Sequence, residues 1–219
     1  MSEGLFDTWI TRTFGCKYPI VQGALAYQAR AELVSAVSNA GGIGILTSAI
    51  YDKKEDFHNE VRKTKSLTDK PFGVNLNLFP STRTMNNDEV IEVILEEGIR
   101  FVEASGGSPK PFLDRLHAGG VKFIQKVPTL KFAKRMEEIG CDAVTVLTYG
   151  GGGHPGTEEI AASVIIPASV KSLKIPVLCA GAIADGRGLV ASLALGACGI
   201  YMGTRFLATK ECPMHDAGW

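Results

Sequence analysis

The chain has 219 residues, of which 45% are hydrophobic, and its 23 basic side chains balance its 23 acidic ones, giving a net charge of zero. This balance argues against a dedicated nucleic-acid surface, which requires a basic excess, and no run of about 18 apolar residues is present to cross a membrane. The start, Met1-Ser2-Glu3-Gly4, has no basic region followed by an apolar one, so we expect a cytoplasmic protein without a secretion signal.

Taken in chain order, the sequence repeats one unit, in which an amphipathic helix ends at a glycine and a short apolar strand follows. The unit appears at Gly41, before a strand expected over 43–47, and at Gly98, before a strand expected over 101–104. Glycine suits the left-handed position that ends a helix, and an immediate return strand requires a crossover connection. Repeated returns of this kind predict a parallel sheet.

Eight strands are expected, at 20–24, 43–47, 72–76, 101–104, 123–126, 143–147, 177–180 and 200–203. Helices are expected between them, at 30–39, 53–65, 88–97, 109–118, 130–139, 158–173 and 187–195. This pattern is typical of a TIM (β/α)8 barrel, so we predict a single α/β barrel domain over 1–219. A doubly wound open sheet is the alternative, but it places the spacing G-x-G-x-x-G after its first strand, and Gly23-Ala24-Leu25-Ala26 lacks that spacing.

A glycine-rich loop follows the strand expected at 143–147 and reads Gly150-Gly151-Gly152-Gly153-His154-Pro155-Gly156. Four successive glycines let the backbone approach a flat ligand closely, at an entropic cost that a merely structural turn has no reason to carry. His154 lies at a strand end and is therefore a candidate general acid or base. A loose loop carrying a chance histidine is the structural alternative.

The other strand ends are rich in glycine, amide and hydroxyl groups and poor in acids. Only Glu103 and His154 among them are strong metal ligands, so no metal site is predicted. The five cysteines are odd in number and widely spaced, which indicates small core residues and neither a disulfide framework nor a zinc site.

Two strand ends favour a phosphate group. In a barrel of this kind, the loops after the seventh and eighth strands usually hold phosphate on backbone amides, and here those loops begin at Gly181 and Gly203. Two ordinary turns are the alternative, with Asp185 as a helix N-cap, and the two roles are compatible.

Two side chains at strand ends suit a heterocyclic or anionic ligand. Asn75 is placed to present its amide to the edge of a heterocycle, although an asparagine at a strand end is often a satisfied turn residue. Lys126, inside a barrel mouth, would neutralise an anionic ring or phosphate, and an ordinary surface lysine is its alternative.

Several motifs in the same order resemble the nitronate monooxygenases, formerly called 2-nitropropane dioxygenases. The flavin-dependent enoyl-acyl-carrier-protein reductases share them. The motifs are Pro19-Ile20-Val21-Gln22-Gly23, Pro71-Phe72-Gly73-Val74-Asn75, the loop at 152–156, and the stretches 176–188 and 203–211.

The resemblance implies FMN bound at the mouth of the barrel. It places Gln22, Gly23 and Ala24 against the flavin ring, Asn75 at its pyrimidine side and Lys126 at the ring or the ribityl chain. The phosphate site corresponds to Gly181, Ala182, Gly203 and Thr204. The other expected cofactor contacts are Gly152, Gly153, Ala180 and Met202.

His154 matches the catalytic histidine of the resembled family. The implied reaction is oxidation of alkyl nitronates by O₂ to carbonyl compounds and nitrite, in which His154 holds the nitronate or takes the α-proton of a nitroalkane. The alternatives are an NAD(P)H-dependent reductase of enoyl thioesters and a flavin-binding protein without catalysis. Members of the family continue beyond Trp219, so we expect the C-terminal helix and lid to be truncated and the uncovered apolar surface to favour a homo-oligomer.

Overall fold

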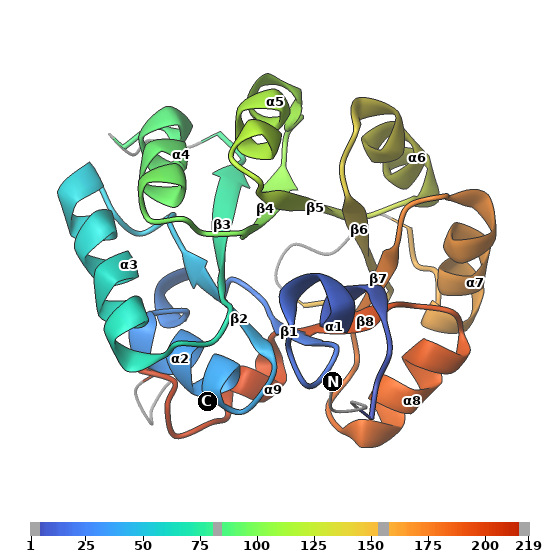
Figure 1. Ribbon diagram of the computed structural model, residues 1–219. Helices are drawn as coiled ribbons and strands as arrows, with labels where there is room; N and C mark the ends of the chain where they lie inside the picture. The colour runs from blue at the N-terminus through green and yellow to red at the C-terminus, as the bar shows by residue number, and fades with distance from the viewer. Residues whose placement is uncertain (1–4, 81–84, 153–157, 215–219) are drawn as a thin grey trace.

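Eight parallel strands pair in chain order and close into a barrel through the pairing of β1 with β8, which confirms the predicted TIM barrel (Figure 1). The computed structural model describes residues 5–80, 85–152 and 158–214. The strands are Ile20–Gln22 (β1), Ile43–Thr47 (β2), Gly73–Leu78 (β3), Phe101–Gly106 (β4), Lys122–Val127 (β5), Ala143–Leu147 (β6), Val177–Ala180 (β7) and Gly199–Met202 (β8).

The helices surround the barrel, and each of α2 to α8 lies between two successive strands in the chain (Figure 1). They are Ala31–Asn39 (α2), Lys54–Leu67 (α3), Asn87–Glu96 (α4), Lys110–Ala118 (α5), Leu130–Ile139 (α6), Ala162–Ser172 (α7) and Gly186–Ala194 (α8). Three short elements were not predicted: Trp9–Phe14 (α1), the 3-10 helix Ala26–Gln28 (η1) and Thr204–Leu207 (α9).

Many predicted boundaries are shifted by one or two residues from those in the structure, and hydrogen bonds account for two of the differences. The helix expected over 158–173 begins only at Ala162, because the carbonyl of Ile160 accepts the Tyr149 N–H (3.0 Å) and ties this segment to the loop after β6. The first strand ends at Gln22 and not at Ala24, because the Ala24 N–H donates to the Tyr201 hydroxyl (3.1 Å) and leaves the strand ladder. A backbone bond at the first point and a bond to a side chain at the second thus override local helix and strand propensity.

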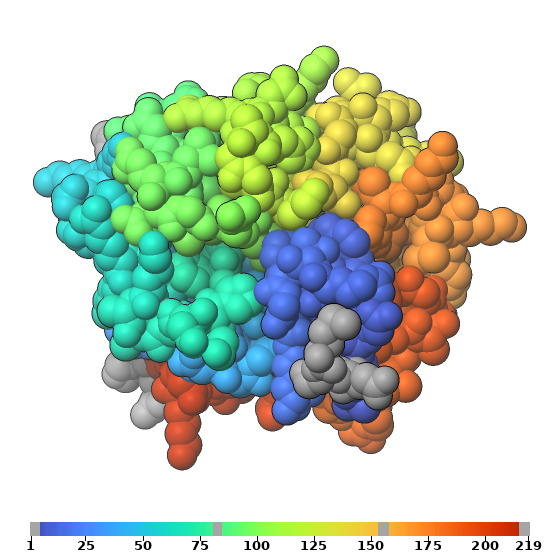
Figure 2. Space-filling model, viewed as in Figure 1, coloured from blue at the N-terminus to red at the C-terminus, as the bar shows by residue number. Residues whose placement is uncertain are grey.

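The buried residues form two main layers, one inside the barrel and one between the strands and the outer helices. Successive strand residues alternate between them, so that Ile45 lies in the inner layer and Leu46 in the outer one. Helix α1 lies across the amino-terminal end of the barrel, where Ile10 joins the inner layer and Phe14 stacks on Phe101 at 4.5 Å (Figures 1 and 2). A functional site is therefore expected at the opposite, carboxyl end.

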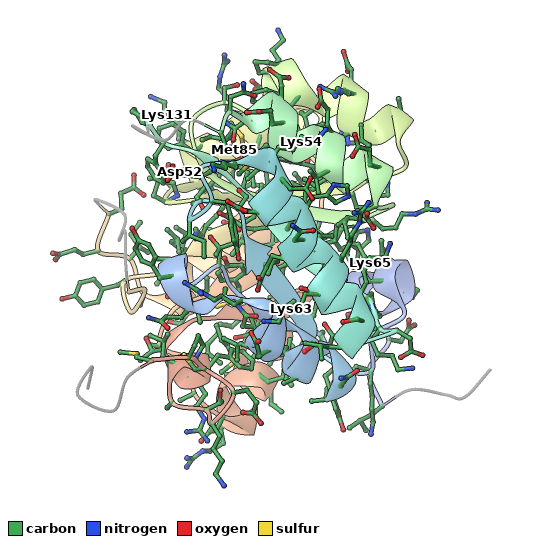
Figure 3. The ribbon with its side chains drawn as sticks, turned by 90° about the vertical axis from the view of Figure 1, so that its left-hand side faces the viewer. Asp52, Lys54, Lys63, Lys65, Met85 and Lys131 are labelled. Carbon is green, nitrogen blue, oxygen red and sulfur yellow. The ribbon has the colours of Figure 1, made fainter. Side chains whose placement is uncertain are left out.

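Ion pairs link α3 to α4 on one side of the barrel (Figure 3). Lys54 contacts Glu92 at 2.9 Å, and the Glu97 carboxylate, just after α4, accepts bonds from Arg62 and Lys65 at 2.9 Å each. The hydrogen bond from Lys65 makes the largest contribution among the contacts that together lower the pKa of Glu97 to about 2. No helix within the described ranges combines the length and apolarity needed to cross a membrane.

Candidate active site at the barrel mouth

A cluster of polar side chains lies inside the carboxyl end of the barrel. Asn75 comes from β3, Glu103 from β4, Lys126 from β5 and Tyr201 from β8. The register pairs Asn75 directly with Glu103, so the two side chains stand next to each other on adjoining strands. The strand pairing thus gathers amide, carboxylate, ammonium and phenol groups at one opening.

Glu103 is the centre of the cluster and is fully buried. Its Oε2 accepts the Asn75 Nδ2 at 2.6 Å, and its Oε1 accepts the Ser105 hydroxyl at 3.4 Å. The Lys126 ammonium lies 3.8 Å from Oε1. Since a buried carboxylate is costly unless it is paired and hydrogen-bonded, these contacts allow its burial. Lys126 is therefore a lysine of the barrel mouth and not of the outer surface.

Tyr201 lies beside this carboxylate and shapes the first strand end. Its hydroxyl accepts the Ala24 N–H at 3.1 Å, and the Lys126 Nζ lies 5.1 Å from the centre of its ring. Burial, and then the nearby Glu103 charge, raise the pKa of Tyr201 well above its ordinary value, so the phenol stays neutral. A Cβ added at Gly23 would lie 2.3 Å from Cε1 of this ring. Close packing against Tyr201 therefore accounts for a glycine at position 23.

Two side chains predicted to contact the cofactor do not face the mouth. Gln22 is fully buried, and its amide bonds the backbone of Ile45, accepting the N–H at 3.3 Å and donating to the carbonyl at 3.5 Å. Met202 packs with Leu189 on the helix side of β8. Both side chains therefore have partners within the protein. The side chain of Ala180, by contrast, belongs to the inner layer of the barrel.

Three loops that carry few side chains meet beside the ends of β6, β7 and β8. The Gly150 carbonyl accepts the Ala182 N–H at 3.0 Å. Gly181 has a φ of +122°, and a Cβ there would lie 2.7 Å from the Gly151 backbone nitrogen, so the two loops pack backbone to backbone. A Cβ at Gly152 would have the Thr204 hydroxyl as its neighbour, at 4.0 Å.

The predicted phosphate residues are thus gathered at one place. Gly181 and Ala182 follow β7, and Gly203 is the N-cap of α9, whose first residue is Thr204. The first N–H groups of a helix have no acceptor within it, so the start of α9 adds donors to those of the loops. Asp185 caps α8 as predicted, accepting the Arg187 N–H at 2.9 Å. Gly153 and the predicted catalytic His154 lie outside the described residues.

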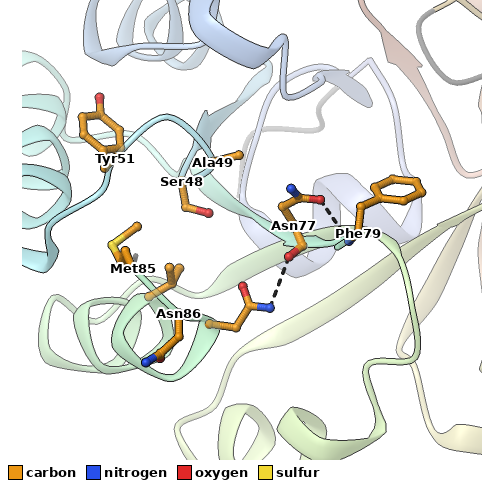
Figure 4. Close-up of a pocket in the computed structure, with 9 residues that line it drawn as sticks. Ser48, Ala49, Tyr51, Asn77, Phe79, Met85 and Asn86 are labelled. Atoms are coloured by element: carbon orange, nitrogen blue, oxygen red, sulfur yellow. Dashed lines mark hydrogen bonds between the residues drawn. The ribbon is translucent and has the colours of Figure 1, made fainter. Parts of the chain in front are cut away.

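A cavity of about 250 Å³ borders the mouth above β2 and β3 (Figure 4). Its wall includes Ser48, whose hydroxyl donates to the Asn75 carbonyl at 2.7 Å, and Asn77, whose carbonyl accepts the Asn87 amide at 3.2 Å. Among the described residues, the lining also contains Tyr51 and Phe79 and no charged side chain. Neutral polar and aromatic walls suit an uncharged part of a substrate. A second cavity, of about 500 Å³, lies at the amino-terminal end, away from the polar cluster.

Two residues near the mouth were not recognised from the sequence. Tyr201 lies within an apolar run that resembles an ordinary core strand, and only its position between the outward-facing Ile200 and Met202 indicates that it points inward. Thr145 is paired with Lys126 in the register, is fully buried, and its hydroxyl has no partner in the described structure. Such a group is a candidate for contact with a bound molecule.

The described residues do not support a metal site or a reactive thiol. Within them, no group of three His, Cys, Asp or Glu side chains is arranged to hold a metal ion. The five cysteines are free thiols, and burial raises the pKa of Cys141 and of Cys198 to about 12 each. A thiol with so high a pKa is a poor nucleophile at neutral pH.

Comparison with known proteins gives consistent matches over nearly the whole chain. A family model described as nitronate monooxygenase matches residues 7–218. A (3aS,4S,5R,7aS)-5-hydroxy-7a-methyl-1-oxo-octahydro-1H-indene-4-carboxyl-CoA dehydrogenase from Rhodococcus jostii is 38% identical over 96% of this chain, which spans 58% of that protein. A probable nitronate monooxygenase from Staphylococcus saprophyticus is 32% identical, over 94% of this chain and 69% of its own length.

The same fold is found in a solved structure of a FabK mutant from Thermotoga maritima. It superposes with a TM-score of 0.89 and is 36% identical, covering 96% of this chain and 69% of its own. The match therefore extends from the motifs to the arrangement of the whole barrel.

Proposed function

Because the chain belongs to the nitronate monooxygenase family, we propose that it is an FMN-dependent oxidoreductase acting on a small molecule. The observation that carries this proposal is the presence of two different features at the same end of the barrel. Side-chain-poor loops meet at Gly152, Gly181 and Thr204, and an amide and an ammonium group stand on β3 and β5. The first feature suits a phosphate, and the second suits a polar heterocycle.

The residues present fit this cofactor. Backbone groups at Gly181, Ala182, Gly203 and Thr204 would hold the phosphate, because these four residues themselves carry no side chain larger than that of threonine. Lys126 would supply positive charge beside the ring, since its ammonium lies at the opening with a 20% exposed side chain. FMN, when bound, supplies the hydride chemistry, and the protein supplies binding and electrostatics.

We propose that the substrate is an acyl thioester of coenzyme A. Two relatives named as carboxyl-CoA dehydrogenases are 38% and 37% identical to this chain, whereas the similar proteins named as probable nitronate monooxygenases are 28–32% identical. The cavity beside the mouth, whose described lining residues are uncharged, suits the neutral acyl part of such a thioester.

Redox chemistry next to a thioester carbonyl moves a hydride and a proton. His154 is the proposed group that takes or returns the proton, because an imidazole titrates near neutral pH and His154 belongs to the glycine-rich motif that follows β6 in the sequence. Oxidation of an alkyl nitronate by O₂ is the second candidate, favoured by the family model and the staphylococcal relatives. It needs the same histidine to hold an anion.

An anaerobic titration of the FMN-loaded protein separates the two substrate classes. NADH is added to bleach the visible flavin absorption, and crotonyl-CoA is then added as the thioester probe. Return of the flavin absorption without O₂ is the expected result. Bleaching by ethyl nitronate, with nitrite released on exposure to O₂ and no response to crotonyl-CoA, would support the second candidate and overturn the first.

A further inference from the structure

The Glu103 carboxylate determines which end of the Asn75 amide is used inside the protein. An ionised carboxylate only accepts hydrogen bonds, so the group that Asn75 turns toward it must be the NH₂ and not the oxygen. The structure agrees, with Nδ2 at 2.6 Å from Glu103 Oε2 and 3.4 Å from the Glu103 carbonyl. Asn75 is itself only 5% exposed.

The same contact leaves the oxygen of Asn75 as the end that a ligand can meet. Among the described residues, no hydrogen bond to the Oδ1 atom is found, while Nδ2 has two acceptors. An asparagine amide is almost symmetric in shape, so without a charged partner its two ends are nearly interchangeable. The carboxylate removes that ambiguity and presents an acceptor toward the mouth.

Lys126 is held by the other oxygen of the same carboxylate. Its Nζ lies 3.8 Å from Oε1, while Asn75 uses Oε2, so one buried group positions both an acceptor and a cation. An acceptor beside a cation matches an imide edge, which offers one N–H donor flanked by carbonyl oxygens. The isoalloxazine ring of a flavin carries such an edge.

We propose that Glu103 is a positioning residue that fixes the Asn75 amide so that its oxygen faces the imide N–H of bound FMN. The inference rests on the proposed FMN-binding function. Glu103 does not touch the cofactor in this proposal; it acts through Asn75 and, more weakly, through Lys126. If the ion pair were purely structural, any effect of Glu103 on FMN affinity would not depend on the presence of Asn75.

A double-mutant cycle on the FMN dissociation constant tests the proposal. Glu103→Gln keeps the shape but lets either end of Asn75 face inward, so FMN should bind about three- to tenfold more weakly. In the Asn75→Ala background the same change should alter FMN affinity by less than about twofold, because the amide it orients is gone. Ser105→Ala is the matched control, since it removes the longer contact to Glu103, and it should leave FMN affinity unchanged.

Equal losses from Glu103→Gln in both backgrounds would overturn the positioning role while leaving FMN binding intact. A wild-type protein that takes up no FMN would overturn the proposed function as well. Thermal unfolding of each variant confirms that it folds.

A measurement on the wild-type protein covers the case in which Glu103→Gln fails to fold. FMN methylated at the imide nitrogen lacks the N–H, so the wild type should bind it more weakly than FMN. The Asn75→Ala variant should bind the two flavins equally. Equal binding of the two flavins to the wild type would overturn the proposal.

Discussion

Replacing Gly23 by alanine tests whether this glycine is required by the protein's own packing. The added Cβ would lie 2.3, 2.4 and 2.6 Å from Cε1, Cζ and the hydroxyl oxygen of Tyr201. Ordinary contacts between carbon atoms are about 3.5–4.0 Å, so the ring must move by on the order of 1 Å. That movement is resisted because Tyr201 is 8% exposed and packs within the inner layer of the barrel.

Overpacking of this kind costs about 1–3 kcal/mol of unfolding free energy. In a chain of this size each kcal/mol lowers the Tm by about 2–4 °C. The Ala24 N–H bond to the Tyr201 hydroxyl should weaken at the same time, because the two groups flank the added methyl.

Chemical denaturation of six proteins, with and without Gly23→Ala in the wild-type, Tyr201→Phe and Tyr201→Leu backgrounds, measures this cost. Gly23→Ala should be destabilising alone and also in the Tyr201→Phe background, because phenylalanine keeps the two ring carbons nearest to the Cβ. In the Tyr201→Leu background the ring is absent and most of the cost should disappear. A cost that is the same in the Phe and Leu backgrounds would refute the packing explanation and return Gly23 to a purely cofactor-related role.

Four further outcomes are expected. Gly152→Val should weaken FMN binding severalfold by filling the space between the loops, whereas Gly186→Ala, which adds a methyl group in open space, should leave FMN binding unchanged. Fluorescence titration with FMN compares the two variants. Equal effects on FMN affinity would count against the loop site. Ser169→Ala should raise the unfolding free energy by about 1 kcal/mol, because it removes a buried hydroxyl without a partner in the described structure; urea denaturation showing a loss would contradict this. The ionised Glu97 carboxylate contributes stability that is complete above its ordinary pKa of 4.5 and is lost as the pH falls toward about 2. Glu97→Gln should therefore make the unfolding free energy depend less on pH in the acid range. An unchanged pH dependence would argue against the ion pairs. His154→Ala should retain FMN and lower turnover by about 10²- to 10⁴-fold, and an unchanged rate would remove it from the mechanism.

The barrel was predictable because its signals are local. Glycines at helix ends and apolar runs fix where each strand begins, and eight such runs in sequence have few other ways to bury their surface. The positions of Asn75 and Lys126 at the mouth followed from their places at strand ends. The short helices α1 and α9 were missed because four to six residues carry too little periodicity to be recognised.

Side-chain direction was harder to predict because it depends on register. Gln22 was expected at the flavin ring, yet its amide is taken up by Ile45 of the neighbouring strand. The partnership of Asn75 with Glu103 requires the pairing of β3 with β4, and the contact of Gly23 with Tyr201 requires closure of the barrel between β1 and β8. No local pattern in one sequence specifies contacts between strands so far apart.

The central claim is that the loops after β7 and β8 hold the phosphate of FMN, and comparing the affinities of FMN and riboflavin for the same protein tests it most directly. The two molecules share the ring and the ribityl chain and differ in the phosphate. Charge-assisted hydrogen bonds contribute about 1.5–3 kcal/mol, so FMN should bind roughly 10- to 100-fold more tightly than riboflavin, and the difference should shrink in Gly152→Val. Equal affinity for the two flavins, or no binding of either, would contradict the claim.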